Sequence, residues 1–407
     1  MVTYKKIKEE DRDKFQEMLH YAFSPHREEV DHHKDEDYWS MIGDPRGIYD
    51  GDKLLAVSSI HNLESRLRGD WLPMGGISAV ATAPENRHKG YTKVMLTELL
   101  RELREKNVVL SSLWPFSYPF YDKLGWRFCD RYTSYELEPE VLKFAAKNPD
   151  GKFRQVFRDD HDDIVPTYRR FVRKFNLPLR RSSDWWKYNR FRQWGKTVYC
   201  YLWEKNTYVN GYVIYSIEKG SQGEQKQKKK LNVDELVYET EEAFFQLLRF
   251  LYNHGSQMSR ITLPSPLPEG LSMLDLANDP RAIEAREKPG IMFRCVDVKA
   301  ALEALPFPER VEDKIIMSIE DPLLEKNSEQ FRLNFDEDSP PAISRLNQKG
   351  SKPDISMDVG TLTQLYVGYL NPSQAVTAGN ITLENDDKLP ALNKIFPGKR
   401  TLFYDGF

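Results

Sequence analysis

Hydrophobic residues along the first 140 positions recur at spacings typical of strands and of helices. Alternating or continuous apolar runs predict strands at residues 3–7, 54–60, 76–83, 108–113 and 127–137, and helical spacing predicts helices around 15–22, 91–105 and 118–124. Leu96, Leu99, Leu100 and Leu103 share one face of the helix at 91–105. Strands interleaved with helices after a meander predict an α/β fold built on a central, partly antiparallel sheet.

The remainder of the chain predicts two more domains. After a polar stretch at 147–151, which we take as a linker, the order of strands, helix and strand from 197 to 263 is similar to that of the first domain. The last third begins near Gly290 with a strand at 291–298, and short strands and helices follow. We therefore predict an α/β (α+β) protein with domains at 1–145, 146–289 and 290–407.

Composition narrows the classes of function. Lys and Arg number 59 and Asp and Glu 62, a net charge of −3, which removes the electrostatic case for a general nucleic-acid binder. The N-terminus lacks an apolar signal segment, and no uncharged run approaches the roughly 20 residues that span a bilayer, so we expect a cytoplasmic protein without a membrane partner. The three cysteines lie far apart and the histidines form no metal spacing, so no disulfide framework or metal site is predicted.

The segment from Ser78 to Lys93 carries the densest candidate chemistry. A strand ends at Pro84, a tight loop follows, and Gly90 begins a long helix. Backbone N–H groups at a helix start are unpaired and suit a phosphate, and a glycine there lets a pyrophosphate approach the backbone closely. The side chains that add positive charge around this point are Arg87, His88, Lys89 and Lys93. Taken alone, an ordinary basic helix cap explains the segment equally well.

About thirty residues later, the sequence from Pro119 to Trp126 places Tyr121 on a short helix that Gly125 ends before a strand. These two blocks, in this order, resemble the acyl-CoA loop and the tyrosine motif of the GNAT acetyltransferases. The three-part layout and the terminal phenylalanine resemble the Eis (enhanced intracellular survival) family. Members of that family carry an N-terminal GNAT domain, a second, degenerate GNAT-like domain with its own central mixed sheet, and a C-terminal domain similar to sterol carrier proteins.

The resemblance implies acetyl-CoA as co-substrate, no metal, and a role for each matching position. The strand that would hydrogen-bond the pantetheine arm through its backbone is Val80, Ala81 and Thr82, and the pyrophosphate loop is Arg87, His88, Lys89, Gly90, Tyr91, Thr92 and Lys93. Phe116 and Ser117 would border the cofactor further along. Tyr121 matches the general acid, and Phe407 matches the residue whose terminal carboxylate acts as base. Thr92 departs from the Gly or Ala of many GNAT loops, and His88 and Lys89 replace a more arginine-rich run.

The second domain lacks the features of a cofactor loop. Only Glu239 and Thr240 separate its strand at 231–238 from the helix that begins near Glu241. No glycine or arginine is available there, and the two glutamates would repel a pyrophosphate. We therefore expect one cofactor site in each chain.

These observations favour an acetyl-CoA-dependent N-acetyltransferase, in which a primary amine attacks the thioester directly. The amine would belong to a small molecule such as a polyamine or an aminoglycoside, and the resemblance implies a homo-oligomer, a hexamer built from trimers. Two alternatives stay open: a non-catalytic acyl-CoA or lipid carrier, and a protein lysine acetyltransferase. Tyr121 could instead be a core tyrosine, and Phe407 a packing anchor. The acidic residues at 28–31 and 35–37 are either a solvated face or a mouth that attracts cationic amines.

Overall fold

The computed structural model describes residues 2–23, 42–146, 150–191, 197–218, 229–306, 311, 313–336, 339–346 and 352–407. The acidic residues at 28–37 and positions 147–149 of the predicted linker lie outside these ranges. The chain forms two compact units. Unit 1 combines Met1–Asp130, Ile291–Thr401 and Phe407, and unit 2 combines Arg131–Gly290 with Leu402–Gly406.

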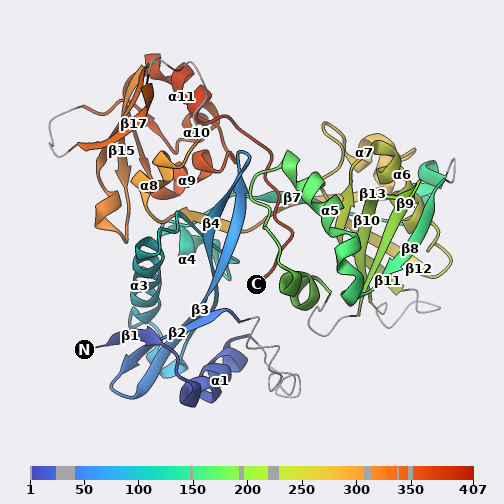
Figure 1. Cartoon of the computed structure of the whole chain (residues 1–407), viewed down its shortest axis with the longest axis horizontal. Helices are drawn as coiled ribbons and strands as arrows, with labels where there is room; N and C mark the ends of the chain where they lie inside the picture. The colour runs from blue at the N-terminus through green and yellow to red at the C-terminus, as the bar shows by residue number, and fades with distance from the viewer. Residues whose placement is uncertain are drawn as a thin grey trace. The chain divides into compact units, whose positions relative to one another are not determined.

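The first sheet of unit 1 is mixed and carries strands from distant parts of the sequence (Figure 1). Its described strands lie in the order β1 (Thr3–Lys6), β2 (Asp44–Asp50), β3 (Lys53–Leu67), β4 (Asp70–Thr82), β5 (Leu110–Leu113), β14 (Met292–Cys295) and β6 (Arg127–Phe128). Strands β1 to β4 form an antiparallel meander, β4 and β5 are parallel, and β14 is antiparallel to both β5 and β6. The helices of this region are α1 (Arg12–Phe23), α3 (Tyr91–Glu105) and α4 (Tyr118–Asp122).

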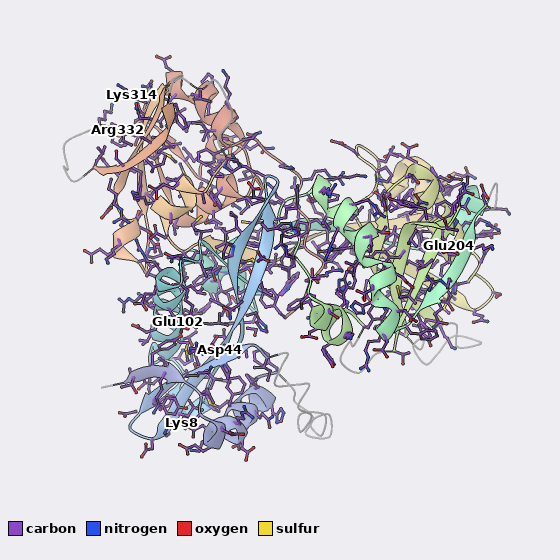
Figure 2. The ribbon with its side chains drawn as sticks, viewed as in Figure 1. Lys8, Asp44, Glu102, Glu204, Lys314 and Arg332 are labelled. Atoms are coloured by element: carbon purple, nitrogen blue, oxygen red, sulfur yellow. The ribbon has the colours of Figure 1, made fainter. Side chains whose placement is uncertain are left out.

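Helix α3 packs closely on the first sheet. Its apolar face is fully buried, as the helical spacing predicts, and a Cβ atom on Gly75 of β4 would lie only 2.5 Å from Leu103 Cδ2. Arg46 of β2 adds a polar link, because its guanidinium reaches Glu102 of α3 at 2.6 Å and Asp44 at 2.8 Å. Both carboxylates are labelled in Figure 2. Apolar packing and this ion-pair network together fix the helix against the strands that precede it.

Two predicted strands belong to other sheets than the sequence suggested. Residues 127–137, predicted as one strand of the first domain, divide into β6, which pairs with β14, and β7 (Arg131–Leu137), which pairs with β12 and β13 in unit 2. The strand predicted at 291–298 as the start of the third domain is β14 of the first sheet. The prediction of one continuous strand at 127–137 was wrong. The sequence did not indicate the sheet partners of either segment, because hydrophobic alternation indicates a half-buried strand without indicating which neighbour supplies its hydrogen bonds.

The rest of unit 1 is a second α+β region. Its described strands lie in the order β17 (Ser339–Leu346), β16 (Gln330–Asp336), β15 (Asp313–Glu320), β18 (Ile355–Asp358) and β19 (Thr382–Leu383). The helices are α8 (Val298–Glu303), α9 (Val359–Tyr366), α10 (Pro372–Thr377) and α11 (Leu389–Ile395). Every residue of α9 is buried, so this helix lies in the interior of unit 1.

Unit 2 is an α/β domain built on its own sheet. Its described strands lie in the order β13 (Ile283–Pro289), β7, β12 (Met258–Pro264), β11 (Lys229–Tyr238), β10 (Tyr208–Glu218), β9 (Val198–Lys205) and β8 (Lys152–Val156). The helices are α5 (Val165–Phe171), α6 (Glu241–Tyr252) and α7 (Met273–Leu276), with a π-helical turn at Trp185–Arg190.

Candidate active site

Strand β4 separates from β5 in the middle of the first sheet. The two strands pair from Met74 to Ile77 only, although β4 continues to Thr82. Beside this point β4 bulges, with Ala79 in the left-handed region at φ 55°, and its register with β3 shifts by one residue. Among the described strands, the backbone of β4 beyond the bulge therefore has a partner on one side only.

The exposed edge of β4 belongs to residues that the sequence analysis singled out. Ala83 N–H donates to Leu55 O of β3, so strand alternation turns the backbone groups of Thr82 and Val80 away from β3. Unpaired backbone groups of this kind suit an extended ligand that carries amides, which hydrogen-bonds as an added strand would. The pantetheine arm of a coenzyme A thioester is such a ligand.

Helix α3 begins beside the end of β4 with its N-terminus open. Gly90, the residue before the helix, has φ 82° and offers no capping side chain, and a Cβ atom there would meet nothing within 4 Å. Thr82 Oγ1 and Thr92 Oγ1 lie 3.0 Å apart, so the strand end and the helix start are neighbours. A helix N-terminus with unpaired N–H groups and free space in front of it fits a pyrophosphate.

The basic side chains of this loop surround the helix start without filling it. Arg87 stacks over the ring of Tyr21 at 5.3 Å, and Lys89 Nζ donates to Asn86 Oδ1 at 3.1 Å. Together with His88 and Lys93, these side chains are exposed. His88 takes a positive φ of 62°, which the predicted tight loop requires.

The N-terminus of α6 in unit 2, the equivalent place in the second domain, is closed instead. Thr240 caps the helix, because its Oγ1 accepts a hydrogen bond from Ala243 N–H at 3.1 Å. Glu239 beside it pairs with Arg170 at 2.6 Å. The cap occupies one N–H of the first turn, and the acidic residues around it disfavour an anion, as expected if each chain has one cofactor site.

Tyr121 lies in the apolar core on the α3 side of the first sheet. It is 2% exposed and belongs to one cluster with Ile77, Leu96 and Trp126, against which Val80 packs. Burial raises the pKa of its hydroxyl above the ordinary value. A tyrosine that keeps its proton at neutral pH, next to the unpaired edge of β4, can donate that proton to a leaving group.

Phe407 packs on the opposite face of β4. Gly75 faces α3, and a Cβ atom on the next residue, Gly76, would lie 2.8 Å from the ring of Phe407. The same ring meets His61 of β3 at 5.2 Å between centroids. Tyr121 and the terminal residue therefore lie on the two faces of the sheet at the level where β4 and β5 separate.

The face of the sheet that Phe407 covers carries polar side chains, and some of them lack a hydrogen-bond partner among the described residues. His61 Nε2 lies 2.7 Å from Ser78 Oγ, and burial lowers the pKa of this histidine to about 4, so the ring is neutral at physiological pH. Strand register places Ser59 and Ser112 on the same face, and their buried hydroxyls have no partner among the described residues. Buried hydroxyls without protein partners are typical sites for ordered water.

The five residues before Phe407 are anchored in unit 2. The side chain of Asp405 is buried, and its carboxylate accepts from Arg181 Nε at 2.9 Å and Trp185 Nε1 at 2.8 Å. Asn189 Nδ2 donates to Gly406 O at 2.6 Å. Arg181 also pairs with buried Glu235 at 2.8 Å, so the buried positive charge of the arginine lies between two carboxylates, those of Asp405 and Glu235. Buried Leu402 and Phe403 add apolar packing to these polar contacts.

The structure thus brings most of the predicted residues together. One region beside Tyr121 contains Val80, Thr82, Gly90 and Thr92. The side chain of Phe116 is 68% exposed, and its ring centroid lies 5.4 Å from that of Tyr121. Ser117 precedes α4 without capping it. Sequence reasoning missed His61, Ser78, Arg181 and Asp405. The first two sit in ordinary strand patterns, and nothing in the sequence indicates that Arg181 and Asp405 meet.

Within the described ranges, no group of three potential ligand side chains could hold a metal ion. In the same ranges, every helix is too short or too polar to cross a membrane.

Three segments match protein-family models. Residues 3–129 and 177–295 each match an acetyltransferase (GNAT) domain, and residues 298–404 match a sterol carrier protein domain. The predicted fold class, two GNAT-like domains and a domain similar to sterol carrier proteins, is confirmed. The boundaries 1–145, 146–289 and 290–407 stay our proposal. Near two of them, a strand joins the sheet of the neighbouring domain: β7 lies in the sheet of unit 2 and β14 in the first sheet.

Named relatives match along most of their length. N-acetyltransferase Eis from Mycobacterium tuberculosis (strain ATCC 25177 / H37Ra) is 23% identical over 366 residues, which cover 86% of this chain and 85% of that protein. A GCN5-related N-acetyltransferase from Anabaena variabilis superposes with a TM-score of 0.83 at 23% identity, and Eis1 from Mycobacterium abscessus with 0.77 at 18%, each over 100% of both chains. These structures show the same fold.

The two GNAT domains define the class, and this chain is a GNAT acetyltransferase. GNAT acetyltransferases use acetyl-CoA as their co-substrate. Within that class, the similarity to N-acetyltransferase Eis along 86% of the chain, together with the sterol carrier protein domain, supports an acetyltransferase of the Eis type.

The space at Gly90 predicts how a substitution there acts on binding. In Gly90→Asp, a side chain at positive φ and a negative charge occupy the place where the pyrophosphate would lie, so we expect acetyl-CoA affinity to fall at least about 100-fold. Titration calorimetry measures it, with Gly270→Asp, an exposed glycine of unit 2 at φ 78°, as control. Retained affinity with a normal circular dichroism spectrum would reduce the loop to a helix cap.

The buried imidazole of His61 predicts a pH dependence of stability. Its folded-state pKa of about 4 lies below the unfolded value near 6.5, so between these values the unfolded chain binds a proton that the folded chain does not. The free energy of unfolding therefore falls as pH drops from 6.5 to 4, by up to about 3 kcal/mol from this group. Urea unfolding at pH 7.5 and 4.5 should show a smaller loss in His61→Gln, and an unchanged loss in His88→Gln, whose side chain is exposed. Equal losses in wild type and His61→Gln would contradict the assignment.

Proposed function

We propose that this protein transfers the acetyl group of acetyl-CoA to a primary amine of a small molecule by direct attack, with Tyr121 as general acid and the terminal carboxylate of Phe407 as base. One observation carries the proposal. The tyrosine and the terminal residue lie on opposite faces of the sheet where β4 and β5 part. A thioester that passes through this opening would present its sulfur to one face and its carbonyl carbon to an amine on the other.

On the α3 side, the backbone of Val80 and Thr82 would hold the pantetheine arm. The start of α3 at Gly90, with Arg87, His88, Lys89, Tyr91, Thr92 and Lys93 around it, would hold the pyrophosphate. The backbone of Ala81 belongs to the same strand, and exposed Phe116 and Ser117 would border the arm beyond Tyr121. As the C–S bond breaks, a proton from Tyr121 would neutralise the thiolate. Its raised pKa keeps that proton in place through the physiological range.

On the other face, the amine must lose a proton, because a solution amine with a pKa near 10.4 is protonated at neutral pH. The carboxylate of Phe407 is a weak base in water but a good electrostatic partner for a cationic amine. The buried, unpartnered hydroxyls of Ser59 and Ser112 could hold water between the amine and this carboxylate. A polyamine or an aminoglycoside fits such a site, since each offers primary amines on a polar frame.

The decisive experiment is thiol release from acetyl-CoA with a panel of polyamines, aminoglycosides and lysine peptides, followed by mass spectrometry of the products. Acetylation of a small amine supports the proposal. Acetylation of the peptides alone would favour a protein lysine acetyltransferase. The sterol carrier protein match at 298–404 supports a second candidate, an acyl-CoA or lipid carrier, and lipid binding without thiol release would favour it. Sedimentation of the purified chain tests our further proposal that it forms a hexamer built from two trimers.

The hydroxyl of Tyr121 is the group to remove first. Tyr121→Phe keeps the buried ring, so we expect kcat to fall about 10²- to 10⁴-fold with acetyl-CoA affinity unchanged. Tyr4→Phe is the matched control, because Tyr4 is a partly buried tyrosine whose hydroxyl donates to Glu102. Wild-type turnover in Tyr121→Phe would leave the residue a purely structural role.

The chain terminus makes a separate prediction. Deleting Phe407, or adding two residues after it, removes or displaces the carboxylate, so we expect turnover to fall by at least about 100-fold while acetyl-CoA still binds. Phe407→Leu retains the carboxylate and loses the contact with His61, and we expect an intermediate loss. Full activity in the extended protein, with the extension confirmed by mass spectrometry, would exclude a role for the carboxylate.

A further inference from the structure

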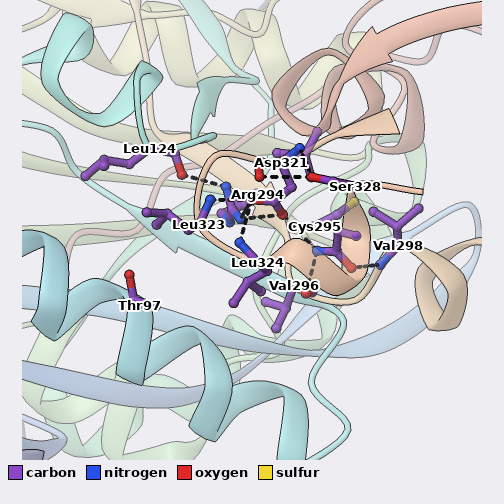
Figure 3. A network of polar contacts seen from close by, with 12 residues as sticks. Thr97, Leu124, Arg294, Cys295, Val296, Val298, Asp321, Leu323, Leu324 and Ser328 are labelled. Carbon is purple, nitrogen blue, oxygen red and sulfur yellow. Dashed lines mark hydrogen bonds and ion pairs between the residues drawn. The ribbon is translucent and has the colours of Figure 1, made fainter. Parts of the chain in front are cut away.

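Arg294 of β14 forms a fully buried ion pair inside unit 1 (Figure 3). Its Nη2 reaches both carboxylate oxygens of Asp321, at 2.5 and 2.6 Å, and both side chains are 0% exposed. Asp321 follows directly after β15, in the segment that matches the sterol carrier protein domain. The pair therefore joins the sheet of the first GNAT domain to the third domain.

The other arm of the guanidinium holds the turn that carries Tyr121. Arg294 Nη1 donates to Leu124 O at 2.5 Å. It occupies the space beside Gly125, where a Cβ atom would lie 1.8 Å from Nη1, and the guanidinium also lies 5.2 Å from the centre of the Trp126 ring. The glycine of the tyrosine motif is thus required for two reasons, its φ of 87° and the arginine behind it.

The turn transmits this contact to Tyr121 through the backbone. Leu124 N–H and Trp126 N–H both donate to Tyr121 O, at 3.0 and 3.1 Å. Tyr121 also packs against the Trp126 ring at 6.3 Å between centroids. The position of its hydroxyl is therefore set by a short turn whose far end is fixed by one arginine.

Asp321 is itself held in place from several sides. Its Oδ1 accepts from Leu323 N–H at 2.9 Å and Leu324 N–H at 3.0 Å, and its Oδ2 accepts from Asn327 Nδ2 at 2.9 Å. A carboxylate with this many donors is fixed in orientation. It can in turn fix the arginine whose Nη2 donates to both of its oxygens. Lysine offers a single ammonium and cannot serve Leu124 O and Asp321 together in the same geometry.

We propose that Arg294 is a positioning residue for Tyr121, and that Asp321 makes the third domain part of the catalytic apparatus of the first. The inference rests on the proposed function, in which Tyr121 delivers a proton. A shift of about 1 Å at a catalytic group costs on the order of 100-fold in rate. The ion pair acts by holding the Tyr121 turn within that tolerance.

The test compares Arg294→Met and Arg294→Lys with wild type on the best amine from the panel. We expect kcat to fall 10- to 100-fold in both variants, with the calorimetric Kd of acetyl-CoA within about twofold of wild type. In a Tyr121→Phe background the same substitutions should cost less than about threefold, because the group that they position is absent. Arg104→Met is the matched control: Arg104 pairs with Asp297 at 2.7 Å between the same two parts of unit 1, away from Tyr121, and we expect no change in kcat.

Hydrogen exchange of the peptide at 118–126 provides a readout that needs no turnover. Faster exchange there in Arg294→Lys, with unchanged exchange around 90–96 and a wild-type melting profile, supports the proposal. Unchanged exchange at 118–126, equal losses of kcat with and without the Tyr121 hydroxyl, or a loss confined to KM would each overturn it. If no amine is acetylated, the proposed function fails, and the exchange data alone still decide whether Arg294 holds the turn.

Discussion

The early end of the pairing between β4 and β5 is the constraint on which the site depends. A sheet that stayed paired to Thr82 would have no free backbone edge and no opening between its faces. The bulge at Ala79 turns β4 away and keeps its pairing to β3 on the other side. The open start of α3 at Gly90 then lies beside the end of the same strand. One backbone irregularity thus supplies both the strand edge and the approach to the helix terminus.

Buried ion pairs hold two segments of the chain in place. The Tyr121 turn is fixed by Arg294 and Asp321, and the residues before Phe407 are fixed by Arg181 and Asp405. Buried ion pairs add little net stability, because the desolvation of both charges offsets their attraction. Their geometry is strict, however, because removing either partner leaves an unpaired charge inside the protein. Both pairs therefore suit the task of fixing a segment whose exact place matters.

The two GNAT domains show how small the difference between an open and a closed helix terminus is. Helix α3 begins after a glycine without a capping side chain, and α6 begins after Thr240, which caps it, with Glu239 alongside. The same strand–helix junction is thus uncapped in one domain and capped in the other. A few side chains at the junction decide this, while the fold around them stays similar.

The sequence alone determined the order of the domains, the mixed α/β class, the helix at 91–105 and the motifs around Gly90 and Tyr121. These features depend on local residue spacing, on turn residues and on the resemblance of the two motifs to those of GNAT acetyltransferases. The residues from 127 to 137 were read as one strand, since alternation does not identify a strand's neighbours. Only the tertiary structure could place β14 in the first sheet, Arg294 behind Gly125, and His61 under Phe407. Each of these contacts joins positions far apart in the chain, and the free energy that selects them comes from burial and charge pairing in three dimensions, which no local pattern contains.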